Sequence, residues 1–282
     1  MIIDFHTHTF PEAIAERAVT KLANSSNMQN YLSGKTSDLQ TSMQETHIDY
    51  SILLPVVTKP SQQETVNKSA IELNDHYQET GLISFGGIHP DNDHYRDIIR
   101  SLKGNGIRGI KIHPVFQETY IDDIRFLRIL DCACENGMIV VTHAGFDISY
   151  PGLDYVTPSH ILSAIEQVKP DKLVLAHMGG WNCWDEVKEL LVGKNVWFDT
   201  SFSFYPIRPM NAAIPYAWKP QLTMSQFKDL ALSHGTDHIL FGSDSPWTAQ
   251  TENIALLQEC GFTDTSLKAI LGKNAAKLLG AL

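Results

Sequence analysis

Short apolar stretches rich in β-branched residues alternate along the chain with longer stretches of helical period. Each short stretch is bounded by Gly, Pro, Ser or another polar residue, which is typical of buried strands. Between two of them, Val66, Ala70, Leu73 and Tyr77 are spaced to share one face of a helix. The predicted strands are Met1–His6, Asp49–Leu54, Leu82–Ile88, Ile107–His113, Met138–His143, Lys172–His177, Asn195–Thr200 and His238–Gly242.

This alternation predicts an α/β fold. Strands that alternate with helices pair in parallel through right-handed crossovers. Eight such units are the number that closes a (β/α)8 barrel. The sequence contains neither GxGxxG after the first strand nor GxxxxGK[ST], so nucleotide-binding folds lose support. We therefore predict a single TIM-barrel domain over residues 1–282, with its site at the carboxyl ends of the strands.

Composition and charge narrow the class of protein. A chain of 282 residues with 43% hydrophobic content can bury a core without disulfides or a structural metal. A formal net charge of -10 without Lys/Arg runs argues against nucleic acid or an anionic membrane as a partner. No apolar run approaches the ~18 residues of a spanning helix, and no signal-peptide core is visible. We expect reduced cysteines, a cytoplasmic location, a small-molecule substrate and, by default, a homodimer.

Side chains that bind metals or move protons follow four of the predicted strands. His6 and His8 are two positions apart in one strand, so they share a face and form a ready chelate for zinc. His143, His177 and Asp244 stand at the ends of three further strands. Because the carboxyl ends of parallel strands meet at one mouth of a barrel, these residues predict one shared site.

Two charged residues lie inside predicted strands. Burying the charge of Lys111 inside the barrel is costly unless that charge is paired. Lys111 therefore either faces inward, as a cation for a substrate carboxylate or a partner of Asp4 or Asp244, or it faces outward. Asp4 has the same strand parity as His6 and His8. We therefore expect Asp4 to hold one imidazole in its tautomer.

Further candidates surround the predicted mouth. His113, which precedes a proline, contacts substrate or makes a structural hydrogen bond. Trp181 and Trp247 follow two of the strand-end motifs and are expected to wall the pocket. The long segment 201–223 suits either a planar or carboxylated ligand or a dimer contact. Its candidate residues are Phe202, Phe204, Tyr205, Arg208, Tyr216 and Trp218.

Taken jointly, the motifs at the strand ends resemble the amidohydrolase superfamily, in the branch that includes aminocarboxymuconate-semialdehyde decarboxylase. They are His6-Thr7-His8, Gly109-Ile110-Lys111-Ile112-His113-Pro114, Thr142-His143-Ala144-Gly145, Ala176-His177-Met178-Gly179-Gly180 and Gly242-Ser243-Asp244-Ser245-Pro246-Trp247. The resemblance implies that His6, His8, His143 and Asp244 bind a metal. It implies that Asp244 also takes a proton from bound water, and that His177 stabilises an oxyanion or binds a second metal.

The resemblance leaves two reactions open. The first is hydrolysis of a small-molecule amide, lactone or ester through a metal-bound hydroxide. The alternative is non-oxidative decarboxylation of an aromatic or unsaturated carboxylic acid, for which Lys111 or Arg208 would supply a cation. The implied cofactor is a divalent ion, zinc first and manganese as the alternative. One ion is expected rather than two, although some branches bridge two ions with a carboxylated lysine at the position of Lys111.

Overall fold

The computed structural model describes residues 1–214 and 218–280. Its strands are β1 (Ile3–Thr7), β2 (Tyr50–Leu53), β3 (Leu82–Ser84), β4 (Gly86–Gly87), β5 (Gly109–Ile112), β6 (Ile139–Thr142), β7 (Leu173–Leu175), β8 (Trp197–Asp199) and β9 (Ile239–Leu240). Its α-helices are α1 (Ala15–Ser26), α2 (Thr36–Thr46), α3 (Gln63–Asn74), α4 (Tyr77–Thr80), α5 (Tyr95–Gly104), α6 (Ile124–Glu135), α7 (Pro158–Val168), α8 (Trp184–Leu190), α9 (Met224–His234), α10 (Gln250–Glu259), α11 (Asp264–Lys268) and α12 (Asn274–Leu279). Three short helices of other types are η1 (Pro60–Gln62), η2 (Thr236–His238) and the π-helical η3 (Ala269–Lys273).

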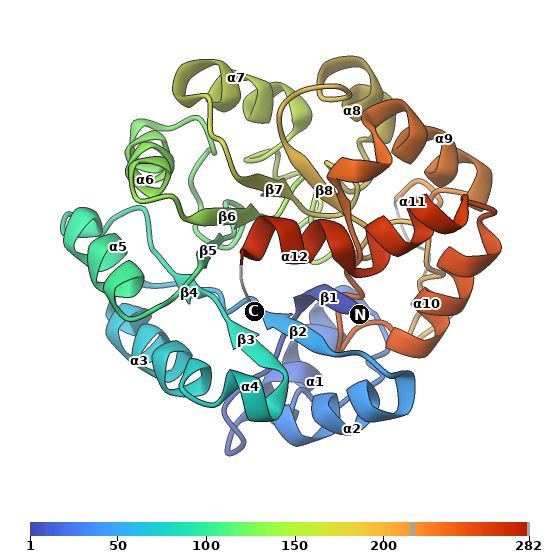
Figure 1. The fold of residues 1–282 in the computed structure, drawn as a ribbon, viewed down its shortest axis with the longest axis horizontal. Coiled ribbons are helices and arrows are strands. Elements are labelled where there is room, and N and C mark those ends of the chain that lie inside the picture. Colours follow the sequence, from blue (N-terminus) through green and yellow to red (C-terminus); the bar gives the residue numbers. More distant parts are fainter. Residues whose placement is uncertain (215–217, 281–282) are drawn as a thin grey trace.

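The strands form a TIM barrel surrounded by helices (Figure 1). The paired strands of the described ranges are parallel, in the orders β1-β2-β3 and β4 through β9. The segments β3 and β4 lie within one predicted strand, Leu82–Ile88, which is interrupted at Phe85. Backbone hydrogen bonds link β1 to the chain after β9: Phe5 N donates to Phe241 O at 2.7 Å, and Asp244 N donates to His6 O at 2.8 Å. The eight predicted strands are confirmed.

Two apolar clusters show which residues face the barrel axis. An inner cluster includes Val141 of β6 together with residues of α12, the helix that crosses one mouth of the barrel (Figure 1). Ile110 and Ile112 of β5 belong to the outer cluster, between the strands and the helices. Side chains alternate along a strand, and Lys111 pairs in register with Val141. Lys111 therefore faces the barrel interior, and the outward orientation is wrong.

Strand β1 contains an irregularity that redirects its side chains. Relative to β2, one extra residue lies between Asp4, which pairs with Ser51, and Thr7, which pairs with Leu53. A bulge of this kind changes the face to which the following side chains point. The shared facing predicted for Asp4 and His6 from simple alternation is therefore wrong.

The segment after β8 is held against the segment after α1. Gln29 N donates to Arg208 O at 2.9 Å, and Met210 N donates to Asn27 O at 3.0 Å. These bonds fix one side of the mouth at which the strands end. Tyr216, a predicted pocket residue of this segment, lies outside the described residues.

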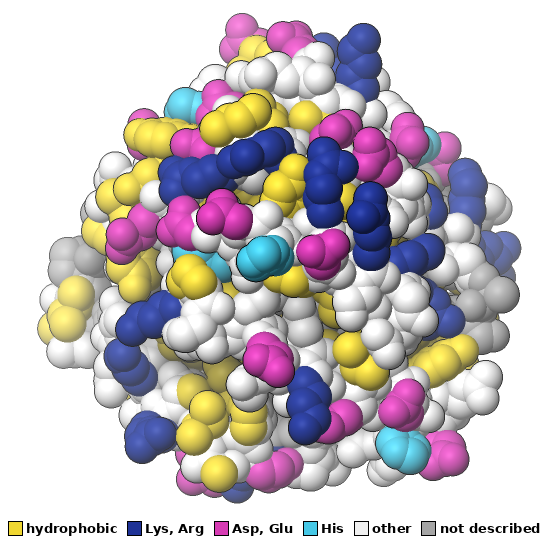
Figure 2. All heavy atoms as spheres, turned by 90° about the vertical axis from the view of Figure 1, so that its left-hand side faces the viewer, with side chains coloured by type: hydrophobic (Ala, Val, Ile, Leu, Met, Phe, Trp, Pro, Cys, Tyr) yellow, Lys and Arg dark blue, Asp and Glu magenta, His cyan; other side chains and the backbone are white. Residues whose placement is uncertain are grey.

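One side of the helical ring carries charged side chains of both signs among hydrophobic ones. Figure 2 shows Lys and Arg side chains interspersed with Asp and Glu over the side formed by the helices at the left of Figure 1. None of the helices in the described ranges is long and apolar enough to cross a membrane. The four cysteines are free, as the sequence predicts.

Candidate metal centre

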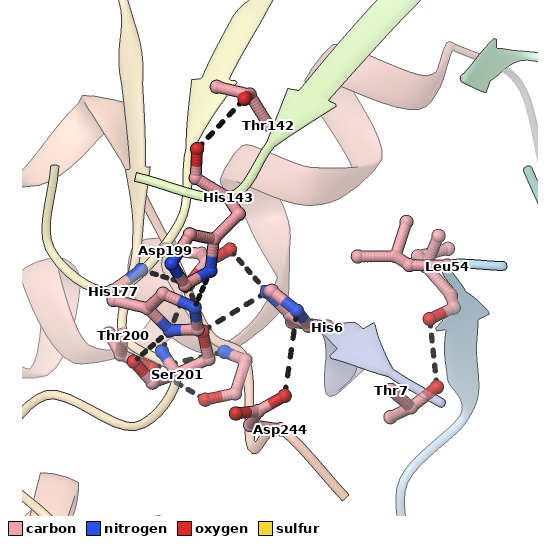
Figure 3. Close-up of polar contacts among 12 residues, drawn as sticks. His6, Thr7, Leu54, Thr142, His143, His177, Asp199, Thr200, Ser201 and Asp244 are labelled. Carbon is pink, nitrogen blue, oxygen red and sulfur yellow. Dashed lines mark hydrogen bonds and ion pairs between the residues drawn. The ribbon is translucent and has the colours of Figure 1, made fainter. Parts of the chain in front are cut away.

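Five polar side chains from different strands meet at the carboxyl mouth of the barrel. His6 lies in β1, His143 follows β6, His177 follows β7, Asp199 ends β8, and Asp244 follows β9. Figure 3 shows these side chains turned toward one another. Each is at most 7% exposed. The convergence predicted from the strand ends is therefore present in the fold.

His6, His8 and Asp244 form a compact triad. His6 Nε2 lies 3.2 Å from His8 Nε2. Asp244 Oδ1 lies 3.3 Å from His8 Nε2 and 3.6 Å from His6 Nε2. Ligands ~2.0–2.1 Å from a tetrahedral zinc ion are separated by about 3.3 Å. The three donor atoms thus have the spacing of one face of a zinc coordination shell.

The hydrogen-bond partners of the imidazoles fix their tautomers. Leu54 O lies 2.9 Å from His8 Nδ1, and Ser201 O lies 3.0 Å from His177 Nδ1. Phe146 O lies 3.0 Å from His143 Nε2. Carbonyl oxygens only accept, so each of these ring nitrogens carries the proton. In the neutral rings, the other nitrogen of each histidine then presents a lone pair.

These lone pairs face one another. His143 Nδ1 and His177 Nε2 are 3.1 Å apart, so this contact needs a cation or a shared proton between two acceptors. Burial lowers the pKa of His177 and takes the pKa of His143 well below its usual range. A shared proton is therefore disfavoured at neutral pH. The donor set consequently fits metal ions, at this pair as well as at the triad.

Lys111 is a buried cation close to both groups. It is 1% exposed, and none of the hydrogen bonds or ion pairs found in the described ranges involves its side chain. Burial lowers its pKa to about 8, against the opposing charges of Asp199 and Asp244. The charge of Lys111 in turn lowers the pKa of His6, which burial brings to about 4. The ammonium therefore lies within the histidine cluster without a counterion of its own.

The carboxylate that contacts His6 is Asp199, which the sequence analysis missed. Asp199 Oδ2 accepts from His6 Nδ1 at 2.8 Å, and both side chains are almost fully buried. The predicted partner, Asp4, instead accepts from Ser243 N at 2.8 Å and from Gln250 Nε2 at 2.7 Å. The bulge in β1 accounts for this correction, because it separates Asp4 from the face of His6. The sequence feature that could have identified Asp199 is its position as a charged residue inside the predicted strand Asn195–Thr200.

A second buried group contains His113, His143 and Asp147. His113 Nε2 lies 3.6 Å from Asp147 Oδ2, and burial raises the pKa of Asp147 to about 6. The rings of His113 and His143 are stacked, with centroids 4.2 Å apart and planes at 13°. Imidazole lone pairs lie in the ring plane, so stacked rings direct them along nearly parallel lines. This group therefore fits an ion less well than the triad, and it places His113 beside His143 instead.

Two functional candidates have a left-handed backbone. The φ angle is 59° at His177 and 64° at Asp244, a region that favours glycine. Such conformations cost ~1–3 kcal/mol and persist only where the surrounding structure enforces them. His177 lies two residues after β7 and Asp244 four residues after β9, and the turn at each residue directs its side chain into the mouth (Figure 3).

The remaining candidates lie at the edge of the site or outside it. Arg208 is half exposed and pairs with Glu252 at 3.0 Å, and its guanidinium lies over the ring of Tyr31. Within the described ranges its hydrogen bonds and ion pairs do not reach the histidine cluster. Trp247 is partly buried, and its backbone N–H donates to Asp244 O at 2.9 Å. Trp181 is buried and donates from Nε1 to Gln221 at 3.0 Å.

A TIM barrel with a His-x-His strand and an aspartate after its last strand defines a class of barrel enzymes with metal-binding groups at the strand ends. The chain belongs to the amidohydrolase family, whose model (Amidohydro_2) matches residues 3–281. The resemblance drawn from the strand-end motifs is confirmed. A search of curated proteins gives no significant match.

Solved structures share the barrel at low sequence identity. An uncharacterized TIM-barrel protein of Bordetella bronchiseptica has a TM-score of 0.74 and 17% identity, with 99% of this chain and 98% of that chain covered. A dihydroxybenzoic acid decarboxylase of Polaromonas sp. JS666, with bound manganese and 2-nitroresorcinol, has a TM-score of 0.70 and 15% identity, with 99% and 96% covered. A probable 2-pyrone-4,6-dicarboxylic acid hydrolase of Acinetobacter baumannii has a TM-score of 0.66 and 17% identity, with 99% of both chains covered. At these identities the likeness shows the fold.

Proposed function

We propose that the protein is a metal-dependent hydrolase of a small-molecule amide, lactone or ester. The observation that carries the proposal is the two pairs of facing imidazole nitrogens, His6 with His8 at 3.2 Å and His143 with His177 at 3.1 Å. Each pair presents lone pairs that a divalent ion would satisfy. The sequence predicts one bound ion. The second pair of facing nitrogens is the reason to expect two ions, and we expect zinc in preference to manganese.

Lys111 completes this arrangement if its amine is carboxylated. A neutral amine takes up carbon dioxide and releases a proton to give a carbamate. Burial lowers the pKa of Lys111 to about 8, which raises the share of neutral amine at pH 7. The carbamate replaces a cation that has no counterion with an anion close to both histidine pairs. The same burial that makes the ammonium costly therefore favours its modification.

In this reaction Asp244 transfers a proton. Divalent ions at these positions would polarise a substrate carbonyl and lower the pKa of water. Although burial raises the pKa of Asp244, the His8 hydrogen bond and nearby histidines hold it below the usual range. Asp244 is therefore ionised, and it accepts a proton from the attacking water and passes it to the leaving oxygen or nitrogen. The neighbouring fold of a probable dicarboxylic acid hydrolase supports hydrolysis on this barrel.

Decarboxylation is the second candidate, and Lys111 is the observation that favours it. As an ammonium it would hold a substrate carboxylate in a buried position, whereas Arg208 pairs with Glu252 at the edge. Carbon dioxide leaves as the C–C bond to the carboxylate breaks, and the carbon that keeps the electron pair takes a proton that His177 or Asp244 has first accepted from water or from a substrate hydroxyl. The fold shared with a manganese-bound dihydroxybenzoic acid decarboxylase supports this alternative.

Metal content and isotope incorporation separate the two reactions. The protein is purified without chelator or a His-tag from cells grown with bicarbonate, and its metals are counted by mass spectrometry. It is then incubated in H2¹⁸O with panels of lactones, esters, amides and carboxylic acids. Two ions per chain and ¹⁸O in a product acid support hydrolysis. One ion per chain with release of carbon dioxide overturns it in favour of decarboxylation, and no ion under any loading condition overturns both.

A further inference from the structure

We infer that Asp199 and Ser201 position His6 and His177, by holding the proton on Nδ1 of both rings so that both Nε2 atoms face the site. The inference rests on the proposed metal site but applies to either reaction. Neither residue touches the predicted ligand atoms. Both act through the opposite side of the two imidazoles, where a carboxylate and a hydroxyl meet (Figure 3).

The contact with His6 is direct. Asp199 Oδ2 lies 2.8 Å from His6 Nδ1, and Asp199 is fully buried in a region without bulk water. The other oxygen, Asp199 Oδ1, accepts from two backbone N–H groups and from the Ser201 hydroxyl, so both oxygens act as acceptors, as in an ionised carboxylate. An ionised carboxylate only accepts, so Nδ1 is the protonated nitrogen of His6. Its Nε2 lone pair is thereby directed at His8 and Asp244.

Ser201 extends the same control to His177. The Ser201 hydroxyl donates to Asp199 Oδ1, which commits its only proton. Its oxygen can then only accept, and it lies 2.9 Å from His177 Nδ1 and 3.1 Å from His6 Nδ1. Ser201 O, 3.0 Å from His177 Nδ1, is a second acceptor. Both rings are thus anchored on one Asp-Ser unit at the end of β8.

Asp199 also fixes the backbone on which His177 stands. Its Oδ1 accepts from the backbone N–H groups of His177 at 3.0 Å and Ser201 at 3.1 Å. His177 has a left-handed backbone, with φ of 59°. A carboxylate that binds this N–H therefore helps to hold the strained turn that directs the imidazole. A single side chain couples the β1 histidine to the β7 histidine.

The test compares two variants, Asp199→Asn and Asp4→Asn. Both replace a buried aspartate that contacts His6, but only Asp199 contacts its ring. Imidazole ¹⁵N shifts are recorded on the metal-free protein, and zinc and manganese affinities are measured by competition with a chelator. We expect Asp199→Asn to give mixed tautomers at His6 and to weaken metal binding 10- to 100-fold, a typical effect of removing such a partner. Asp4→Asn should leave the His6 tautomer unchanged, because Asp4 contacts only its backbone.

His234 is an internal control, since its Nε2 donates to Val196 O and its Nδ1 accepts from Gly193 N, without contact to Asp199 or Ser201. Its ¹⁵N shifts should be the same in the wild type and in Asp199→Asn. If Asp199→Asn does not fold, Ser201→Ala tests the inference by a smaller shift at His177 that spares His234. An unchanged His6 tautomer with full metal affinity in Asp199→Asn overturns the inference. A wild type that binds no metal overturns the proposed function instead, because the ¹⁵N shifts do not depend on metal.

Discussion

Replacing Lys111 with methionine should make the metal-free protein more stable while abolishing its activity. Burial lowers the pKa of Lys111 from 10.5 to about 8. At ~1.4 kcal/mol per pKa unit, the charged ammonium costs the folded state about 3 kcal/mol at neutral pH. Methionine has nearly the same shape without the charge, and such exchanges cost less than ~1.5 kcal/mol in packing. We therefore expect a net gain of about 2 kcal/mol in unfolding free energy at pH 7.

The gain should depend on pH in a defined direction. The unfolded lysine titrates near 10.5 and the folded one near 8. The penalty of the charge is thus complete below pH 8 and disappears as the pH rises from 8 toward 10.5. The gain from Lys111→Met should be largest at pH 7 and should be lost by pH 10.5, where only the packing cost of the substitution remains.

Urea unfolding at pH 7 and pH 10, in metal-free buffer without carbon dioxide, measures both quantities. Lys68→Met is the matched control, since Lys68 is 76% exposed and lies 3.9 Å from Glu72 across one turn of α3. We expect little change in its stability at either pH. A Lys111→Met variant that is less stable than wild type at pH 7, or whose gain is the same at pH 10, would refute the buried-cation argument.

Three further predictions concern the site. His143→Ala should lose at least one bound ion, and a variant that keeps the full metal content would remove His143 from the centre. Asp244→Asn should retain part of its metal but lose ~10²–10⁴-fold in kcat, the usual effect of a positioned acid or base; full activity would end that assignment. The metal-free protein should lose stability as the pH falls below 6.5, because His6 and His143 stay neutral in the fold while the unfolded chain binds protons. Asp4 and Asp147, with pKa values of about 6, oppose this loss below pH 6, so a Tm that is flat between pH 7.5 and 6 contradicts it.

The barrel and most of its mouth could be predicted because they depend on local patterns. Strands of a parallel barrel are continuous apolar runs, and each is followed by the residue that it presents to the site. His143 directly follows β6, and Asp244 lies two residues after the predicted strand His238–Gly242, so both are found this way. Asp147 is five residues past β6 and beyond the motif Thr142-His143-Ala144-Gly145, so neither the strand pattern nor the motif indicates it.

Asp4 and Asp199 show a different limit. In β1 the sequence alternates regularly, and nothing in Asp4-Phe5-His6-Thr7 marks the extra residue that separates the faces of Asp4 and His6. That bulge depends on pairing with β2 and on the hydrogen bonds to the chain after β9, which are distant in sequence. Because the bulge turns Asp4 away from His6, Asp199 of β8 makes the contact with the His6 imidazole that was expected of Asp4 in β1.

The tautomers could not be predicted for a further physical reason, which is that backbone atoms select most of them. The acceptors for His8, His143 and His177 include the carbonyl oxygens of Leu54, Phe146 and Ser201. Every residue type has that oxygen, so the identity of the side chain carries no signal. Only the three-dimensional path of the loops aims these carbonyls at one side of each ring. The direction of the lone pairs, and with it the capacity to bind cations, is therefore a property of the barrel and not of any motif.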